Sequence, residues 1–353
     1  MTTNPVRILA IETSCDETAA AVIDDGRYVR SNVIASQTAL HQQYGGVFPE
    51  MASRAHIEAI APVIQRAMSD ANAEWDSISA VAVTKGPGLP GSLVVGVNAA
   101  KGLCLARNLP LIGVNHLEGH IYAHWLHEAP IQRLGDTPFP LLALIVSGGH
   151  TELVLVRGHG EFELIGHTVD DAAGEAFDKV ARMLGLGYPG GPALERIARS
   201  GNAHRFKFSR PRMDRPYNFS FSGVKTAVLY VIRDFGGNVD AKLSARVPVS
   251  DIAASFQEAV ADWLTDKTIR AAEQYDVRGI VVGGGVSANR ILRERLTAAA
   301  GARSPRPFPV LFPPLALCTD NAAMIGAAGH YAFVRGVRDE LDLDVLPDLK
   351  LGE

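Results

Sequence analysis

Cysteine is scarce in this chain. Its 353 residues include only Cys15, Cys104 and Cys318, and no two of them form a CxxC pair. An odd number of widely spaced cysteines argues against a disulfide framework and against thiolate ligation of a metal. The sequence therefore predicts a protein of a reducing compartment, the cytoplasm.

Long hydrophobic runs are also missing. The longest apolar stretches, such as Leu141–Val146 and Gly279–Val282, have the length of a strand, whereas a membrane-spanning helix needs about 20 apolar residues. The amino terminus runs almost directly into a strand-like segment, so we expect no signal or transit peptide. These features favour a soluble protein.

The chain has no excess of positive charge, because its formal net charge is −4. Binding to a nucleic acid would therefore depend on a local basic segment or on a partner. One such segment is Arg199–Arg233, whose basic residues alternate with Phe206, Phe208, Tyr217, Phe219 and Phe221. This composition suits phosphate contacts combined with base stacking. It equally suits an ordinary insertion whose aromatic residues form a small core.

The chain is longer than a single hydrophobic core usually allows, which favours two domains. One order of elements, strand-strand-strand-helix-strand-helix, occurs twice, with a break near residues 129–139. This repetition predicts a duplicated α/β fold with a ligand cleft between the halves. We expect an N-terminal domain over residues 1–135 and a C-terminal domain over 136–320 with a basic insertion at about 199–248. A C-terminal helix over about 320–353 would pack back on the first domain.

His116 and His120 are four positions apart in the segment NHLEGH, directly after an apolar strand. In a helix this spacing places both imidazoles on one face, which supplies half of a transition-metal site. An isolated HxxxH is more often a pair of surface histidines, but here glycine-rich loops and the late segment CTDN, which contains Asp320, accompany it.

Three glycine-rich segments follow apolar runs. KGPGLPGS, residues 85–92, matches GxGxxG, but no acid follows at the position of a ribose carboxylate, so we interpret it as a tight loop near a ligand or the histidine helix. VSGGHT, residues 146–151, is either an anion-binding turn or a plain hairpin. GGGVSAN, residues 283–289, lets backbone approach a base, and Asn289 is either a ligand or a helix-start residue, although Ser287 already makes a good N-cap.

Asp16 and Glu17 lie in a bend between the first two strands. They could hold a cation or accept a proton, although such acids are more often part of a solvated turn.

With these residues in view, the chain closely resembles the tRNA threonylcarbamoyladenosine transferase family (TsaD, formerly called glycoproteases). The matching segments are long, occur in order and span nearly the whole chain: IETSCDET, YGGVFPEMASRAH, GPGLPGSL, NHLEGH, VSGGHT, DAAGEAFDK, YPGGP, FSFSGVKTA, GGGVSANR and CTDNAAMIG.

The resemblance implies the actin/hexokinase/sugar-kinase (ribonuclease-H-like) fold and a specific set of site residues. His116, His120 and Asp320 would bind one divalent metal ion, Fe2+ or Zn2+. The threonylcarbamoyl-adenylate would be bound by Ile145, Val146, Ser147, Gly148, Gly149, Asp178, Gly191, Glu195 and Asn289. Glu195 differs in carboxylate length from the aspartate of some relatives. Asp16 and Glu17 remain the candidates for the catalytic base.

The implied reaction transfers the threonylcarbamoyl group from threonylcarbamoyl-AMP to N6 of the adenosine 3′ of the anticodon. The substrates would be tRNAs that read ANN codons, and the products t6A and AMP. The implied partners are the tRNA anticodon loop, a paralogous TsaB-type subunit and a small TsaE-type ATPase.

Three other functions fit parts of the sequence. An ATP-dependent small-molecule kinase of the same fold would not explain His116 and His120. A zinc protease would carry glutamate directly after the first histidine, where this chain has Leu117. A non-catalytic partner subunit could lack the metal ligands, which this chain retains.

Overall fold

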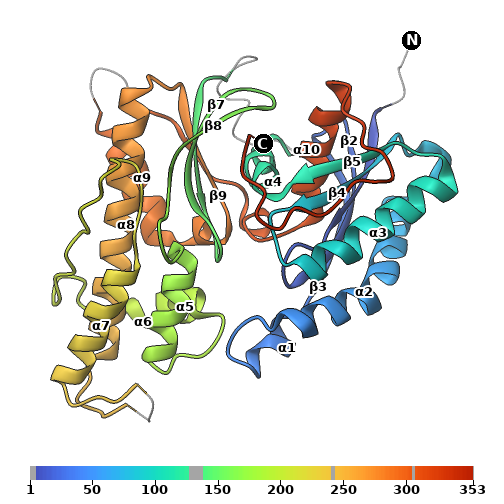
Figure 1. The fold of residues 1–353 in the computed structure, drawn as a ribbon. Coiled ribbons are helices and arrows are strands. Elements are labelled where there is room, and N and C mark those ends of the chain that lie inside the picture. Colours follow the sequence, from blue (N-terminus) through green and yellow to red (C-terminus); the bar gives the residue numbers. More distant parts are fainter. Residues whose placement is uncertain (1–4, 127–137, 240–242, 304–306, 353) are drawn as a thin grey trace. The chain divides into compact units, whose positions relative to one another are not determined.

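The computed structural model describes residues 5–126, 138–239, 243–303 and 307–352. The chain divides into two compact units (Figure 1). Unit 1 comprises Met1–Thr137, Gly158–Phe162 and Pro313–Glu353, and unit 2 comprises Pro138–Arg157 and Glu163–Phe312. The domain boundary expected at residue 135 lies outside the described residues.

The sheet of unit 1 has the strand order β3-β2-β1-β4-β5. The first three strands form the antiparallel meander that the sequence predicts, and β4 and β5 add in parallel. The strands are β1 (Arg7–Glu12), β2 (Glu17–Asp24), β3 (Tyr28–Ser36), β4 (Ala80–Gly86) and β5 (Leu111–Asn115).

Helices cover both faces of this sheet because alternate side chains of a strand point to opposite faces. Leu9 and Ile11 of β1 pack with α2 (Pro49–Asp70) and α3 (Pro90–Arg107) in one cluster. On the opposite face lies α10 (Ala322–Val334), where a Cβ added at Gly326 would come within 2.5 Å of Ile23. The remaining helices among the described residues of unit 1 are α1 (Thr38–Gln42), α4 (His116–Tyr122) and the 3-10 turns η1 (Trp75–Ser77), η2 (Ala123–Trp125) and η5 (Leu315–Leu317).

The chain after α10 is not helical. The C-terminal helix expected over about 320–353 ends at Val334, and residues 335–352 form an irregular strap along β4 and β5. Backbone hydrogen bonds join Asp339 to Leu111 at 2.9 Å and Leu346 to Lys85 at 2.8 Å. The strap thus covers the open edge of β5, whose unpaired backbone groups would otherwise be exposed.

The sheet of unit 2 has the order β10-β9-β6-β7-β8, which repeats the topology of unit 1. In this sheet β6 and β7 pair antiparallel, and the buried strand β9 lies parallel to β6. The strands are β6 (Leu141–Val146), β7 (Thr151–Gly158), β8 (Glu161–His167), β9 (Gly279–Gly283) and β10 (Val310–Leu311). Both units therefore have the predicted duplicated α/β architecture.

The aromatic residues of the basic segment belong to the hydrophobic core of unit 2. Phe219 and Phe221 are 1% and 0% exposed, and Phe208 and Tyr217 are also buried. The hypothesis that these rings stack on bases is therefore wrong. The alternative, an insertion whose aromatic residues are buried, is closer, but the rings join the main core of unit 2 and do not form a small core of their own. This core also includes α5 (Ala173–Met183), α6 (Gly190–Ala198), α7 (Ser222–Asp234), α8 (Val249–Gln274) and α9 (Arg290–Gly301). The 3-10 turn η4 (Gly285–Ala288) follows β9.

Among the described helices, none combines the length and the apolar character that crossing a membrane requires.

Candidate metal centre and glycine loops

The histidine pair lies on a short helix whose first turn is fixed by Asn115. The Asn115 side chain accepts a hydrogen bond from the Leu117 amide at 2.9 Å and donates one to the Lys350 carbonyl at 3.0 Å. The C-terminal strap therefore holds the residue that caps α4. His116 and His120 lie on the same helical face, as the i, i+4 spacing predicts, with ring centroids 4.8 Å apart.

Asp320, just before α10, completes a group of three ligands. Its Oδ1 lies 3.4 Å from His116 Nε2 and 3.3 Å from His120 Nε2. One donor atom from each residue falls within 4.8 Å of the others, a spacing that could hold a metal ion. The side chains of the two histidines are 7% and 1% exposed, and that of Asp320 is 23% exposed. The aspartate is thus the most exposed of the three candidate ligands.

Glu12 is a functional residue that the motif analysis did not single out. It ends the apolar strand β1, is completely buried, and its Oε2 lies 3.1 Å from His116 Nδ1. Thr84 donates to the same oxygen, and the Ser14 amide donates to the other. A carboxylate on Nδ1 fixes the proton there and leaves Nε2 free to bind a metal. The signal in the sequence was an acid at the end of an otherwise apolar strand.

Opposite charges control the protonation of these groups. Burial lowers the pKa of His116, but the carboxylates of Asp320 and Glu12 outweigh it and raise that pKa well above its usual value. Burial likewise opposes ionisation of Asp320, yet His116 and His120 lower the pKa of this carboxyl overall. Burial lowers the pKa of His120 and keeps its ring neutral. The carboxylates of Glu12 and Asp320 therefore favour a positive charge at the position of His116.

These residues fit a divalent metal. Both ring nitrogens of His120 are buried without a hydrogen-bond partner in the described part of the chain, although its Nε2 faces Asp320. A buried polar atom without a partner is costly, and a metal ion would satisfy it. Two imidazole nitrogens and one carboxylate oxygen form a donor set typical of iron and zinc sites with positions open for substrate.

Asp16 and Glu17 stand at the start of β2, within the electrostatic field of Asp320. Burial raises the pKa of Asp16 and raises that of Glu17 to about 7. Ser36 donates to one Glu17 oxygen at 2.7 Å, while the other is buried without a hydrogen bond among the described residues. Glu17 is therefore suited to exchange a proton near neutral pH.

The loop over residues 85–92 lies against the backbone beside the metal centre. The Leu89 amide donates to the Ser14 carbonyl at 2.7 Å, and a Cβ at Gly88 would come within 2.6 Å of that oxygen. This close approach requires glycine, and it agrees with one of the two expected placements of this tight loop, beside the histidine helix, because Ser14 also contacts His116.

The Ser147–His150 turn of unit 2 is closed by two hydrogen bonds. The Ser147 amide donates to the His150 carbonyl at 2.8 Å, and the His150 amide donates to Ser147 Oγ at 3.1 Å. Gly148 and Gly149 are exposed at its tip, and a Cβ at either would meet nothing within 4 Å. The turn therefore presents open backbone at the end of β6, directly after Ile145 and Val146, which are buried.

Gly284 packs against the base of this turn. Its φ is +87°, and a Cβ there would come within 2.4 Å of the Val146 carbonyl oxygen. The segment after β9 is thus held against the end of β6 at a position where any residue other than glycine would be strained.

Asn289, and not Ser287, caps α9. Its Oδ1 accepts a hydrogen bond from the Leu292 amide at 3.0 Å. Its Nδ2 donates to Gln257 Oε1 at 3.0 Å and to Glu195 Oε2 at 3.5 Å. The expectation that Ser287 serves as the cap is wrong, because its hydroxyl is buried without a hydrogen bond among the described residues.

Asp178 is the remaining predicted carboxylate of unit 2, and it receives the Gly190 amide at 2.8 Å. Beside it, Gly191 has open space at its Cβ position. The structure thus brings Asp178 to the start of α6 and Asn289 to Glu195.

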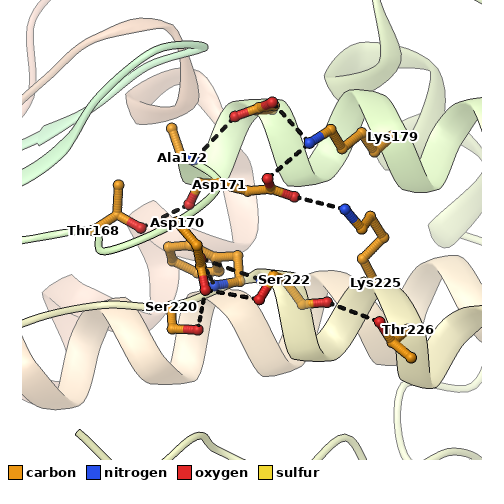
Figure 2. Close-up of polar contacts among 11 residues, drawn as sticks. Thr168, Asp170, Asp171, Ala172, Lys179, Ser220, Ser222, Lys225 and Thr226 are labelled. Carbon is orange, nitrogen blue, oxygen red and sulfur yellow. Dashed lines mark hydrogen bonds and ion pairs between the residues drawn. The ribbon is translucent and has the colours of Figure 1, made fainter.

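Two acids join the start of α5 to α7 (Figure 2). Asp170 accepts hydrogen bonds from the Ser220 and Ser222 hydroxyls at 2.5 and 2.7 Å and from the Phe221 amide at 2.7 Å. Asp171 pairs with Lys179 at 2.7 Å and with Lys225 at 3.2 Å. We call Asp170, Asp171 and these partners the α5–α7 clamp. It connects two segments of the resemblance, DAAGEAFDK and FSFSGVKTA.

A family model described as "tRNA N6-adenosine threonylcarbamoyltransferase" (TsaD) matches residues 28–327. The chain belongs to this family. A relative of that name from Thermomicrobium roseum is 52% identical and covers 98% of this chain and 96% of its own. Another from Symbiobacterium thermophilum is 53% identical, with 98% and 97% covered. The family is one of transferases, so it supports neither the kinase, nor the protease, nor the non-catalytic subunit.

Solved structures of low sequence identity support the fold. HypF from T. kodakarensis superposes with a TM-score of 0.60 at 14% identity over 95% of this chain and 50% of its own. Component A of the (R)-2-hydroxyglutaryl-CoA dehydratase of Acidaminococcus fermentans superposes with a TM-score of 0.52 at 15% identity, over 94% of this chain and 98% of its own. The predicted actin/hexokinase-like fold class is confirmed.

Proposed function

We propose that this transferase moves the threonylcarbamoyl group of threonylcarbamoyl-AMP to N6 of the adenosine 3′ of the anticodon, in tRNAs that read ANN codons. The observation that carries the proposal is the buried group of His116, His120 and Asp320 in a chain of this family. The metal they would hold is Fe2+ or Zn2+, and it would polarise the carbamoyl carbonyl of the bound substrate.

The chemistry explains why an activated donor is needed. The N6 lone pair is delocalised into the adenine ring, which makes this amine a poor nucleophile. In the reaction a bond forms between N6 and the carbamoyl carbon, and the bond from that carbon to the phosphate oxygen breaks. AMP leaves with the electron pair, and N6 loses a proton.

Residues of this chain supply the positioning and the proton transfer. We assign Ile145, Val146, Ser147, Gly148, Gly149, Asp178, Gly191, Glu195 and Asn289 to binding of the adenylate, and His116, His120 and Asp320 to the metal. Asp16 and Glu17 are the candidates to accept the N6 proton. The pKa of about 7 that burial gives Glu17 favours this residue at neutral pH. Glu12 holds the His116 ring in the orientation that a metal requires.

The proposed partners are a TsaB-type paralogous subunit and a TsaE-type ATPase. The test combines the purified chain, these partners, threonylcarbamoyl-AMP and unmodified tRNA, followed by nucleoside mass spectrometry. We expect one t6A formed per AMP released, and none when the target adenosine is replaced by guanosine. Release of AMP with no t6A would contradict the proposal. Metal analysis of anaerobically purified protein distinguishes iron from zinc.

A further inference from the structure

The segment between α1 and α2 carries two exposed aromatic rings. Tyr44 is 53% exposed and Phe48 42% exposed, and their rings are stacked at 5.4 Å with an interplanar angle of 29°. A contiguous exposed apolar patch often marks an interaction site on a protein surface. The core of unit 1 does not use this pair, and the mechanism above gives it no role.

The segment that presents the rings is held by hydrogen bonds. Buried His41 accepts the Phe48 amide at Nδ1, 3.2 Å away, and its Nε2 lies 3.1 Å from Gln37 Oε1. The His41 carbonyl receives the Tyr44 and Gly46 amides at 3.0 and 3.3 Å. Because this frame fixes the backbone on either side of the pair, little entropy remains to be lost when a ligand docks.

The same segment is connected to the metal centre within unit 1. The Gln37 amide donates to the Asp16 carbonyl at 3.1 Å. Burial is the main cause of the raised pKa of Asp16, and the charge of Asp320 raises it further. The aromatic pair is therefore attached to the candidate catalytic bend.

The segment around the pair has no basic side chain. No lysine or arginine occurs between Arg30 and Arg54, and the exposed neighbours of Tyr44 include the amides Gln42 and Gln43. Such a segment cannot attract phosphates, but ring faces can stack on a base, and amides can donate to and accept from its edge.

We propose that Tyr44 and Phe48 form a stacking platform for an unstacked RNA base, the nucleotide next to the target adenosine. The inference rests on the proposed function. An adenine in a loop must leave its stack before a protein can reach N6, and its neighbour then loses a stacking partner. A ring pair attached to the catalytic bend replaces that partner.

The test uses the complete assembly with the proposed partners and an anticodon stem-loop RNA that carries 2-aminopurine next to the target adenosine. Wild-type protein should quench the fluorescence by stacking. Tyr44→Ala and Phe48→Ala should each weaken RNA binding by about 5- to 150-fold, because one base–aromatic stack contributes about 1–3 kcal/mol. The quenching should disappear, whereas metal content and the KM for threonylcarbamoyl-AMP should stay unchanged.

Two further substitutions of Tyr44, one that keeps the ring and one that removes it, and a control elsewhere make the test specific. Tyr44→Phe keeps a ring and should behave as wild type, whereas Tyr44→Leu keeps apolar area without a ring and should not. Tyr28, at the opposite end of β3 from Ser36, is 49% exposed, so Tyr28→Ala is the matched control. The salt dependence of RNA binding should be the same in all variants, because stacking releases no counterions.

Several results would overturn the inference. One is RNA affinity and quenching that survive in a folded Tyr44→Ala/Phe48→Ala double variant, and another is a Tyr44→Leu variant that matches wild type. Loss of a partner subunit in sedimentation, with RNA binding intact, would assign the rings to a protein contact. If wild-type protein forms no t6A, the proposed function fails. If it forms t6A and the variants match it, only the platform is wrong.

Discussion

At the scale of single residues, the candidate metal centre depends on a supporting carboxylate, Glu12, which is not one of the three proposed ligands. Glu12 lies beneath His116 and receives hydrogen bonds from Thr84 and the Ser14 amide. Its charge does two things at once: it sets the tautomer of the imidazole and adds to the need for a cation. The orientation of His116 therefore originates in β1, more than 100 positions earlier in the sequence.

We predict that Glu12→Gln lowers metal affinity by about 10- to 100-fold, because the supporting carboxylate is removed while the ligands remain. His120→Ala should lose nearly all bound metal. Metal titration followed by elemental analysis measures both effects. Glu163→Gln, at an exposed carboxylate paired with Arg157, and His204→Ala, at an exposed histidine, are the controls. Full metal occupancy in His120→Ala would remove this residue from the site.

A second residue-scale prediction concerns Gly284. Because its φ is +87° and a Cβ would meet the Val146 carbonyl at 2.4 Å, Gly284→Ala should lower the Tm and weaken adenylate binding while leaving metal content unchanged. Gly223→Ala is the matched control, since that helical glycine has open space and should gain about 0.5–1 kcal/mol. Thermal unfolding and adenylate titration would decide, and an unchanged adenylate affinity would contradict the assigned role.

At the scale of elements, the α5–α7 clamp gives the start of α5 a pH-dependent attachment. Burial opposes ionisation of Asp170, but hydrogen bonds from Ser220, Phe221 and Ser222 outweigh it, so its pKa falls below the usual 3.8. A carboxyl whose pKa is lowered on folding stabilises the protein above its unfolded pKa. That contribution is lost as the pH falls through the folded pKa.

Asp170→Asn should therefore be less stable than wild type at neutral pH, and the difference should shrink below about pH 4. Urea unfolding at several pH values measures it. The control is Asp234→Asn, at an exposed acid at the end of α7, for which the stability difference from wild type should not shrink at low pH. A constant difference across the acid range would mean that the clamp acts through packing and not through charge.

Strong periodicity made some elements predictable, and its absence hid others. The first strands of both meanders are short, continuous apolar runs joined by tight links, and α5 has a clear apolar face, so their positions followed from the pattern. No helix was predicted over Val249–Gln274, because α8 is buried on several sides, from Ile252 through Gln257 without a break, and shows no single stripe.

The site was predictable only where the spacing is local. The His116–His120 pair follows from the helix repeat, whereas Asp320 needed the family resemblance, because nothing local connects it to α4. Glu12, Asn115 and the strap became visible only in three dimensions. The role of Asn289 as a cap was misjudged because Ser287 is an equally good cap by type, and backbone geometry decides between them.

At the scale of the whole molecule, the basic side chains that can attract RNA are those not already held in ion pairs. Arg210 is held by Asp262 and Asp266 at 2.6 and 2.5 Å, and Arg205 by Asp251. Arg212 and Arg215 are not fully buried, and neither forms an ion pair within the described ranges. The basic segment thus offers less free charge than its composition suggests.

We predict that Arg212→Glu/Arg215→Glu weakens tRNA binding and flattens its salt dependence, by about one unit of slope for each phosphate that the protein no longer neutralises. Metal content and adenylate affinity should not change. Arg210→Glu should instead lower the Tm, because it places three acids together. Filter binding at several salt concentrations, with thermal unfolding, separates the two effects. Retained affinity in the double variant would place the RNA surface elsewhere on the molecule.

Because unit 1 is built from separate parts of the chain, it cannot be completed early during translation. The ribosome makes β1 to β5 first. The two segments of unit 2 follow, with the unit 1 residues Gly158–Phe162 between them, and α10 is made after both. Until α10 emerges, the face of the first sheet that carries Ile23 lacks the helix that packs on it among the described residues, and Asp320 is not yet in place beside His116 and His120. During most of its translation, the nascent chain therefore exposes apolar surface of unit 1 and has an incomplete candidate metal centre. Such exposed surface favours binding by a chaperone.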